Sequence, residues 1–270
     1  SVLGCLCSIT AFFIDVVIDG VFQFVSRYIL RAPIFLGYLL WIFFSVTCVL
    51  LGAAVTQNIH PEAAGSGIPE MKAILSGVVF QKYLSIHSLV AKIVGLILAF
   101  AGGLSIGREG PYVHISCIIA NLMTKVPIWP RIARNDSLRL QILAAACAVG
   151  VSTSFGTPIG GVLFSVEVTA TYYLVENLWK AYFCSLCGTI ITILLKLATQ
   201  KGTISLFQGI DLSFGNIFPY EYAAFVFIGI VGGLLGAAFT SIFSMMVEKV
   251  KTLPYPILRE PTGIYIKAMA

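Results

Sequence analysis

Long apolar runs recur through almost the whole 270-residue chain, and they limit its possible folds more than any other feature. A helix needs about 20 consecutive apolar residues to cross the hydrocarbon core of a bilayer. Only 11% of the residues are charged, whereas soluble globular domains carry about 25%. The sequence therefore predicts an all-α, polytopic, multi-pass membrane protein. The clearest runs are 34–55, 89–106, 138–151, 178–198 and 222–247.

Three further apolar segments are too short to cross a bilayer, and Gly and Pro residues bound them. They are 68–80, 112–123 and 159–168. Irregular backbone at membrane depth is tolerated only where protein or a water-filled cavity satisfies its amides and carbonyls. Broken helices are typical of transporters built from inverted repeats, so we expect tilted, broken helices around a transport site.

Charged and metal-ligating residues are sparse and restrict the class of function. Asp15 and Asp19 interrupt the first apolar run, which argues against a cleavable signal peptide. The basic connection around residues 125–139 lacks interleaved aromatic residues, so it favours a headgroup-facing loop over a nucleic-acid site. The pair Cys184 and Cys187 has metal-like spacing, but no second pair or nearby His completes a tetrahedral site. No metal, cofactor or nucleic-acid partner is predicted.

The segment GSGIPE, residues 65–70, has the features of a helix N-terminus. Ser66 lies between two glycines, and Pro69 fits the first turn of a helix that begins near Ile68. Free amides and the positive end of the helix dipole make such a terminus suited to an anion. A simple capped helix would look similar, so this motif alone leaves both readings open.

The segment GREGP, residues 107–111, repeats the design and adds a carboxylate. Glu109 lies where the helix dipole stabilises negative charge, so its carboxylate competes with an inorganic anion for the same amides. We interpret Glu109 as a gate that blocks when ionised and releases when protonated. A helix cap or an ion pair is the alternative, although adjacent residues do not face each other on a helix, so Arg108 is a poor partner.

A third helix start, preceded by Gly and Pro, occurs in SFGTPIGGVLFSVE at 154–167, and its small residues suit tight helix packing.

A rival interpretation starts from GLSIG at 103–107, which fits the G-x-S-x-G pattern of serine hydrolases, with His114 nearby. That chemistry needs Ser105 exposed on a strand-to-helix turn and a base within reach. Because Ser105 follows an apolar helical run, we expect no enzyme.

The three motifs in this order resemble the CLC family of chloride channels and proton-coupled chloride transporters, over nearly the whole chain. The resemblance implies a homodimer in a lipid bilayer, with a pore in each subunit built from two inverted halves. It implies that chloride and other small anions bind at two segments, with Glu109 as the gate. These segments are Ser66, Gly67 and Ile68, and Arg108, Glu109 and Gly110.

One detail of the sequence separates the family's transporters from its channels. Family transporters carry paired glutamates at the end of the third motif, whereas this chain has Glu167 followed by Val168, as is typical of the family's channels. We therefore expect a voltage- or pH-gated chloride channel, with a proton-coupled antiporter as the alternative, in the plasma membrane rather than an intracellular one.

The resemblance also implies a dimer interface on the helices after Pro158 and Tyr173. The interface candidates are Ile159, Leu163, Leu178 and Ile190.

The resemblance divides the chain into a first repeat and the start of a second. Residues 1–200 correspond to the first repeat, 201–221 to the connection, 222–248 to the first helix of the second repeat, and 249–270 to a loop or tail. Small residues with the same spacing occur in both parts, and they indicate either a repeat or two unrelated packing faces. These are Gly4, Ser8 and Ala11, and Gly229, Gly233 and Gly236.

Overall fold

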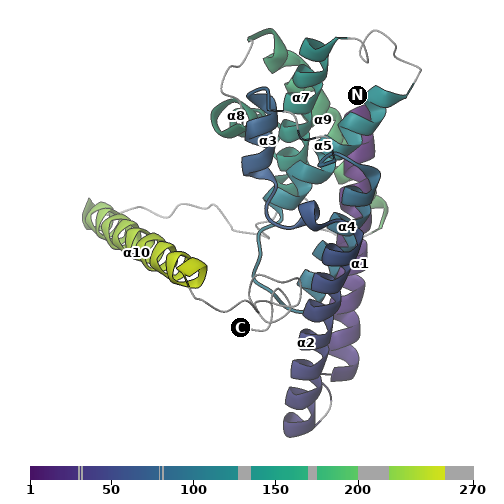
Figure 1. The fold of residues 1–270 in the computed structure, drawn as a ribbon. Coiled ribbons are helices and arrows are strands. Elements are labelled where there is room, and N and C mark those ends of the chain that lie inside the picture. The colour runs from purple at the N-terminus through teal and green to yellow at the C-terminus, as the bar shows by residue number, and fades with distance from the viewer. Residues whose placement is uncertain are drawn as a thin grey trace. The chain divides into compact units, whose positions relative to one another are not determined.

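The protein is described by a computed structural model that covers residues 1–29, 31, 33–78, 80, 82–126, 135–169, 175–199 and 219–252. Every regular element in these ranges is helical (Figure 1), which confirms the all-α prediction. The α-helices are α1 (Val2–Phe24), α2 (Ile34–Ile59), α3 (Ile68–Leu75), α4 (Ile86–Ala101), α5 (Glu109–Lys125), α7 (Asp136–Phe155), α8 (Pro158–Phe164), α9 (Val175–Ala198) and α10 (Pro219–Thr252).

Long helices and short helices both occur along the chain. The apolar run 89–106 differs from the helix observed there, because α4 ends at Ala101 and has 16 residues, too few to count among the spanning segments. Five segments are long and apolar enough to cross a membrane: Val2–Ile29, Ile34–Ile59, Asp136–Phe155, Asn177–Ala198 and Glu221–Lys249. In contrast, α3 has 8 residues and α8 has 7, so neither crosses a bilayer alone. The prediction of an integral membrane protein with broken helices is confirmed.

Local chemistry explains where several helices begin and end. The side chain of Asn135 accepts hydrogen bonds from the N–H groups of Ser137 and Leu138, at 3.1 and 3.4 Å, and so caps the start of α7. Gly156, with φ of 70°, ends α7 in the left-handed conformation that glycine tolerates. Pro158 then opens α8 in its first turn, which is where proline is best accommodated.

The core of the helical unit lies around α5. This helix packs against α7, α7 packs against α9, and α1 packs against α9, α7 and α5. The largest fully buried side chains come from these helices and α3: Ile14, Ile18, Met71, Ile118 and Leu143. In Figure 1, α2 runs beside α4, and it buries only Gly37, Cys48 and Gly52. Several of its large apolar side chains, such as Phe35 and Phe43, are exposed.

The small residues of α1 form a close-packing face against α9. The Ser8 hydroxyl donates to the Gly188 carbonyl at 2.5 Å, and a methyl group added at Gly4 would overlap the Cys184 carbonyl oxygen. The corresponding glycines of α10 have no described atom within contact distance of an added methyl group. The packing interpretation therefore accounts for the α1 trio, and the repeat interpretation remains a prediction.

The chain divides into two compact units, of which the first holds α1 to α9 and the second holds α10. The predicted first helix of the second repeat, 222–248, falls within α10, which begins earlier and ends later. Most of the predicted connection at 201–221 and of the tail at 249–270 lies outside the described residues. Residues 127–134 of the basic connection also lie outside them.

Candidate functional site

The GSGIPE and GREGP segments, about 40 residues apart in the chain, meet in space at Ser66 and Gly110. A methyl group added at Gly110 would overlap the Ser66 hydroxyl and would lie 2.9 Å from the Ser66 carbonyl oxygen. Gly110 is buried, and Ser66 is exposed. Only a residue without a side chain lets the two segments approach this closely.

Each of the two segments contains the N-terminus of a helix, and both N-termini lie at this contact. Gly67, with φ of 91°, precedes the first residue of α3, and Glu109 is the first residue of α5. Prolines occupy the first turns, where an intrahelical N–H bond is not required. Two sets of free amides and two positive dipole ends therefore lie beside each other, which is an arrangement that stabilises a small anion.

Aromatic side chains hold the start of α3 against α5. The rings of Tyr83 and His114 stack with centroids 4.1 Å apart, and His114 Nε2 lies 3.4 Å from the Tyr83 carbonyl oxygen. A methyl group added at Gly67 would lie 2.8 Å from His114 Cβ. The Tyr83 hydroxyl donates to Glu70 Oε2 at 3.5 Å. Burial, with the nearby Glu70 carboxylate, raises the pKa of Tyr83, so the phenol stays a neutral donor.

Glu109 is half-buried, and its carboxylate turns back over Gly107, where an added methyl group would overlap Oε2. Within the described ranges, no cation lies within ion-pair distance of this carboxylate. The alternative of an ion pair for Glu109 therefore has no support among these residues. Glu109 immediately precedes Gly110, the residue that contacts Ser66.

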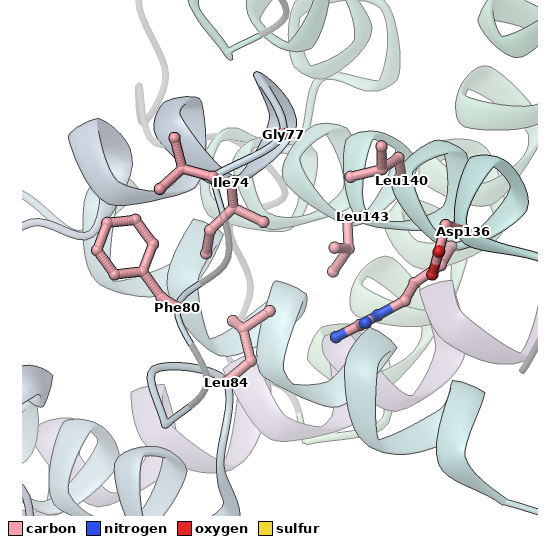
Figure 2. Close-up of a pocket in the computed structure, with 9 residues that line it drawn as sticks. Ile74, Gly77, Phe80, Leu84, Asp136, Leu140 and Leu143 are labelled. Atoms are coloured by element: carbon pink, nitrogen blue, oxygen red, sulfur yellow. The ribbon is translucent and has the colours of Figure 1, made fainter.

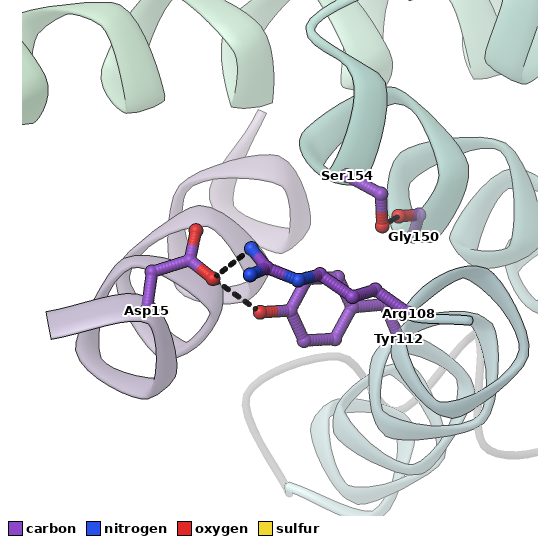
Figure 3. A network of polar contacts seen from close by, with 5 residues as sticks. All are labelled: Asp15, Arg108, Tyr112, Gly150 and Ser154. Carbon is purple, nitrogen blue, oxygen red and sulfur yellow. Dashed lines mark hydrogen bonds and ion pairs between the residues drawn. The ribbon is translucent and has the colours of Figure 1, made fainter. Parts of the chain in front are cut away.

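The Arg108 side chain points toward Asp15 of α1, as Figure 3 shows. Its Nη1 lies 3.0 Å from Asp15 Oδ1, and the same oxygen accepts a hydrogen bond from the Tyr112 hydroxyl at 2.9 Å. The guanidinium also lies 5.2 Å from the centroid of the Phe100 ring, at cation–π distance. The Arg108 side chain is thus engaged by Asp15 of α1 and by the Phe100 ring.

Sequence reasoning missed this network, although a signal was present. An acidic residue inside a spanning helix is costly unless it has a partner, so Asp15 indicated a polar contact within the bundle. The partner could not be named because Asp15 and Arg108 are 93 positions apart. Asp15 now stands as the residue that fixes the start of α5 to α1.

We expect Asp15→Asn to lower the free energy of unfolding by about 1 kcal/mol, because the ion pair is partly exposed and solvent screens it. The Arg108 and Asp15 side chains are 42% and 26% exposed. Asp15→Ala is expected to cost more, since Tyr112 then also loses its acceptor. A double-mutant cycle with Arg108→Gln, read by thermal unfolding in detergent, measures the coupling. Fully additive effects would contradict the pairing.

The third motif packs α8 on α7, as the small residues predicted. A methyl group added at Gly161 would overlap the Ala148 carbonyl oxygen, and Ser154 donates to the Gly150 carbonyl of its own helix at 2.9 Å (Figure 3).

Among the predicted dimer-interface residues, three are exposed, and Leu178 is partly buried against a small apolar cluster formed by α7, α8 and α9. The exposed three are Ile159, Leu163 and Ile190.

The geometry of a serine hydrolase is not met at Ser105. The helix α4, and not a strand, precedes this serine. The His114 ring is fully buried and is stacked on Tyr83, and Ser105 is exposed. The described contacts bring no base to the Ser105 hydroxyl, so nothing supports the nucleophile arrangement.

A cavity of about 210 Å³ lies between the end of α3 and the start of α7 (Figure 2). Apolar side chains line most of it, with Asp136 and Arg139 as its charged residues. Arg139 also donates to Asn121 Oδ1 at 2.9 Å, which links α7 to α5. None of the predicted anion-binding residues lines this cavity, so it is separate from the Ser66–Gly110 contact.

Comparison with known proteins identifies the family. The sequence model described as voltage gated chloride channel matches residues 48–269. Human chloride channel protein 2 is 38% identical over 270 residues, which cover 96% of this chain and 30% of that protein. The chain therefore spans less than a third of the length of this relative.

Solved structures agree with the sequence relatives. The crystal structure of a eukaryotic CLC transporter is 41% identical, with a TM-score of 0.68, over 72% of this chain and 36% of that one. A slow cyanobacterial Cl⁻/H⁺ antiporter matches 99% of this chain and 60% of its own with a TM-score of 0.80, and at 20% identity it shows the shared fold. This chain belongs to the CLC family of voltage-gated chloride channel proteins.

Proposed function

We propose that the protein conducts chloride as a channel and that Glu109 gates it. The observation that carries this proposal is the meeting of two helix N-termini at Ser66 and Gly110. A chloride ion bound there accepts hydrogen bonds from backbone amides of Gly67, Ile68 and Gly110 and from the Ser66 hydroxyl. The helix dipoles supply partial positive charge without a side-chain cation in contact with the ion.

The Glu109 carboxylate and chloride compete for the same space in this mechanism. When ionised, the carboxylate occupies the positive end of α5 and excludes chloride. When protonated, it loses that attraction and swings away, which opens the path. Membrane voltage acts on the same equilibrium because both the carboxylate and the permeating anion are charged.

The alternative function is proton-coupled chloride exchange. Glu167 is exposed at the end of the third motif, and the cyanobacterial structure with the same fold is titled a Cl⁻/H⁺ antiporter. The residue after Glu167 is Val168, and valine cannot carry a proton. This favours a channel over an exchanger.

The reversal potential separates the two functions. We expect the full-length protein in a planar bilayer, at a fixed chloride gradient, to reverse at the chloride equilibrium potential whether or not a pH gradient is imposed. An exchanger must shift its reversal potential with the pH gradient, because each cycle moves protons. A pH-dependent reversal potential would therefore replace the channel proposal with the exchanger.

The proposed assembly is a homodimer in the plasma membrane, with a separate pore in each subunit. The exposed apolar face of α8 and α9 supports this interface. Its three exposed candidates are available to a second copy: Ile159, Leu163 and Ile190. Cross-linking of cysteine variants at these positions in native membranes tests the contact.

A further inference from the structure

A pocket of about 430 Å³ lies at the end of α1, where the chain turns toward α2. Its lining residues come from the last turn of α1, from the π-helical turn Val25–Ile29 and from the connection to α2. They are Phe22, Gln23, Ser26, Arg27 and Arg31. None of them belongs to GSGIPE or GREGP, so this α1-end pocket is separate from the Ser66–Gly110 contact.

The α1-end pocket lies at the depth of the lipid headgroups. The spanning segment Val2–Ile29 ends just before Arg31, and the next one, Ile34–Ile59, begins just after it, at the lower end of the helical unit in Figure 1. Two consecutive spans meet at a membrane surface, because each already crosses the hydrocarbon core. Phe24 and Tyr28, both exposed and with ring centroids 5.0 Å apart, add the aromatic residues that are enriched at this depth.

Two arginines give the α1-end pocket its charge. Arg27 and Arg31 are exposed, and among the described residues no carboxylate lies within ion-pair distance of either guanidinium. The acids of α1, Asp15 and Asp19, are not among the residues that line the pocket. Gln23 adds an amide donor. The pocket therefore presents hydrogen-bond donors and positive charge to the headgroup layer.

This chemistry suits the phosphate group of a lipid. Guanidinium groups remain charged and bind phosphate oxygens through pairs of N–H bonds. Because Arg27 and Arg31 line the same pocket, a phosphate group inside it meets both. Phe22 borders the pocket with an apolar ring, which suits acyl chains and has no use in binding free phosphate. Two positive charges also favour a headgroup of net negative charge over a zwitterionic one.

We propose that the α1-end pocket binds an anionic phospholipid, with Arg27 and Arg31 on its phosphate group. The Gln23 amide contacts the headgroup, and the acyl chains run along the exposed apolar side chains of α1, beginning at Phe22. A lipid held in this way anchors the turn between α1 and α2 at the membrane surface. The inference does not depend on chloride conduction, so the two proposals can fail separately.

Native mass spectrometry of the full-length purified protein in a neutral detergent tests the site. The probe is phosphatidylglycerol, and phosphatidylcholine is the zwitterionic comparison, which the unmodified protein should bind more weakly. Each basic residue near an anionic membrane surface contributes about fivefold in affinity. We therefore expect Arg27→Gln/Arg31→Gln to bind the first phosphatidylglycerol molecule about 25-fold more weakly, and each single variant about fivefold more weakly.

Lys72→Gln/Lys82→Gln is the matched control, because it removes two exposed positive charges elsewhere. Its affinity for phosphatidylglycerol should equal that of the unmodified protein. An equal loss in this control, or full affinity in the arginine double variant, would overturn the inference. So would equal affinity of the unmodified protein for the two lipids. Displacement of the lipid by an equal concentration of inorganic phosphate would assign the pocket to a free anion instead. If the double variant does not fold, the two single variants decide the question.

Discussion

Replacing Glu109 with Gln is expected to yield a protein that conducts chloride at all pH values and has lost most of its pH response. The amide has nearly the shape of a protonated carboxyl group but carries no charge, so it cannot compete with chloride for the helix end. In the proposed mechanism the uncharged carboxyl group leaves the helix end, so the unmodified protein is expected to pass more current in acid. Single-channel and macroscopic recordings of the full-length protein between about pH 5 and 8 measure the change.

The expected size follows from the loss of the one charge that competes with chloride for the helix end. We expect less than about twofold variation in Glu109→Gln over the same range. Glu62→Gln, which neutralises an exposed acid before the first motif, is the control and should keep the normal response. A pH response in Glu109→Gln equal to that of the unmodified protein would remove Glu109 as the gate.

Gly110→Ala is expected to reduce chloride conduction about tenfold. The added methyl group overlaps the Ser66 hydroxyl and forces the two helix ends apart. Overpacked contacts of this kind cost about 1–3 kcal/mol, and about 1.4 kcal/mol corresponds to a tenfold change in affinity. Conductance and chloride affinity, measured together in the full-length protein, report the loss at the site.

Gly20→Ala provides the comparison for this substitution. Gly20 lies exposed in α1 with no atom within 4 Å of an added methyl group in the described chain. Alanine in a helix is more favourable than glycine by up to about 1 kcal/mol, so this variant should fold and conduct normally. Normal conduction in Gly110→Ala would show that the Ser66–Gly110 approach is not needed for the anion path.

The sequence by itself determined the helices and the places where they break. Helix starts at Ile68 and Glu109 depend on neighbouring Gly and Pro residues, whose backbone preferences act within one turn. Apolar length separates spanning helices from short ones, because bilayer thickness is fixed. These are local properties, so α3, α5 and α8 were predictable from the chain alone, together with the family resemblance that their motifs carry.

Only the tertiary structure decided which groups face one another. The pairing of Arg108 with Asp15, and of Lys92 with the carbonyls of Ala63 and Gly65, depends on how α1 and α4 are rotated and packed against the motifs. Apolar periodicity gives little information about that rotation in a membrane helix, because both lipid and protein accept apolar side chains. The contact of Ser66 with Gly110 likewise arises from packing between separate helices, and no local rule of the sequence specifies it.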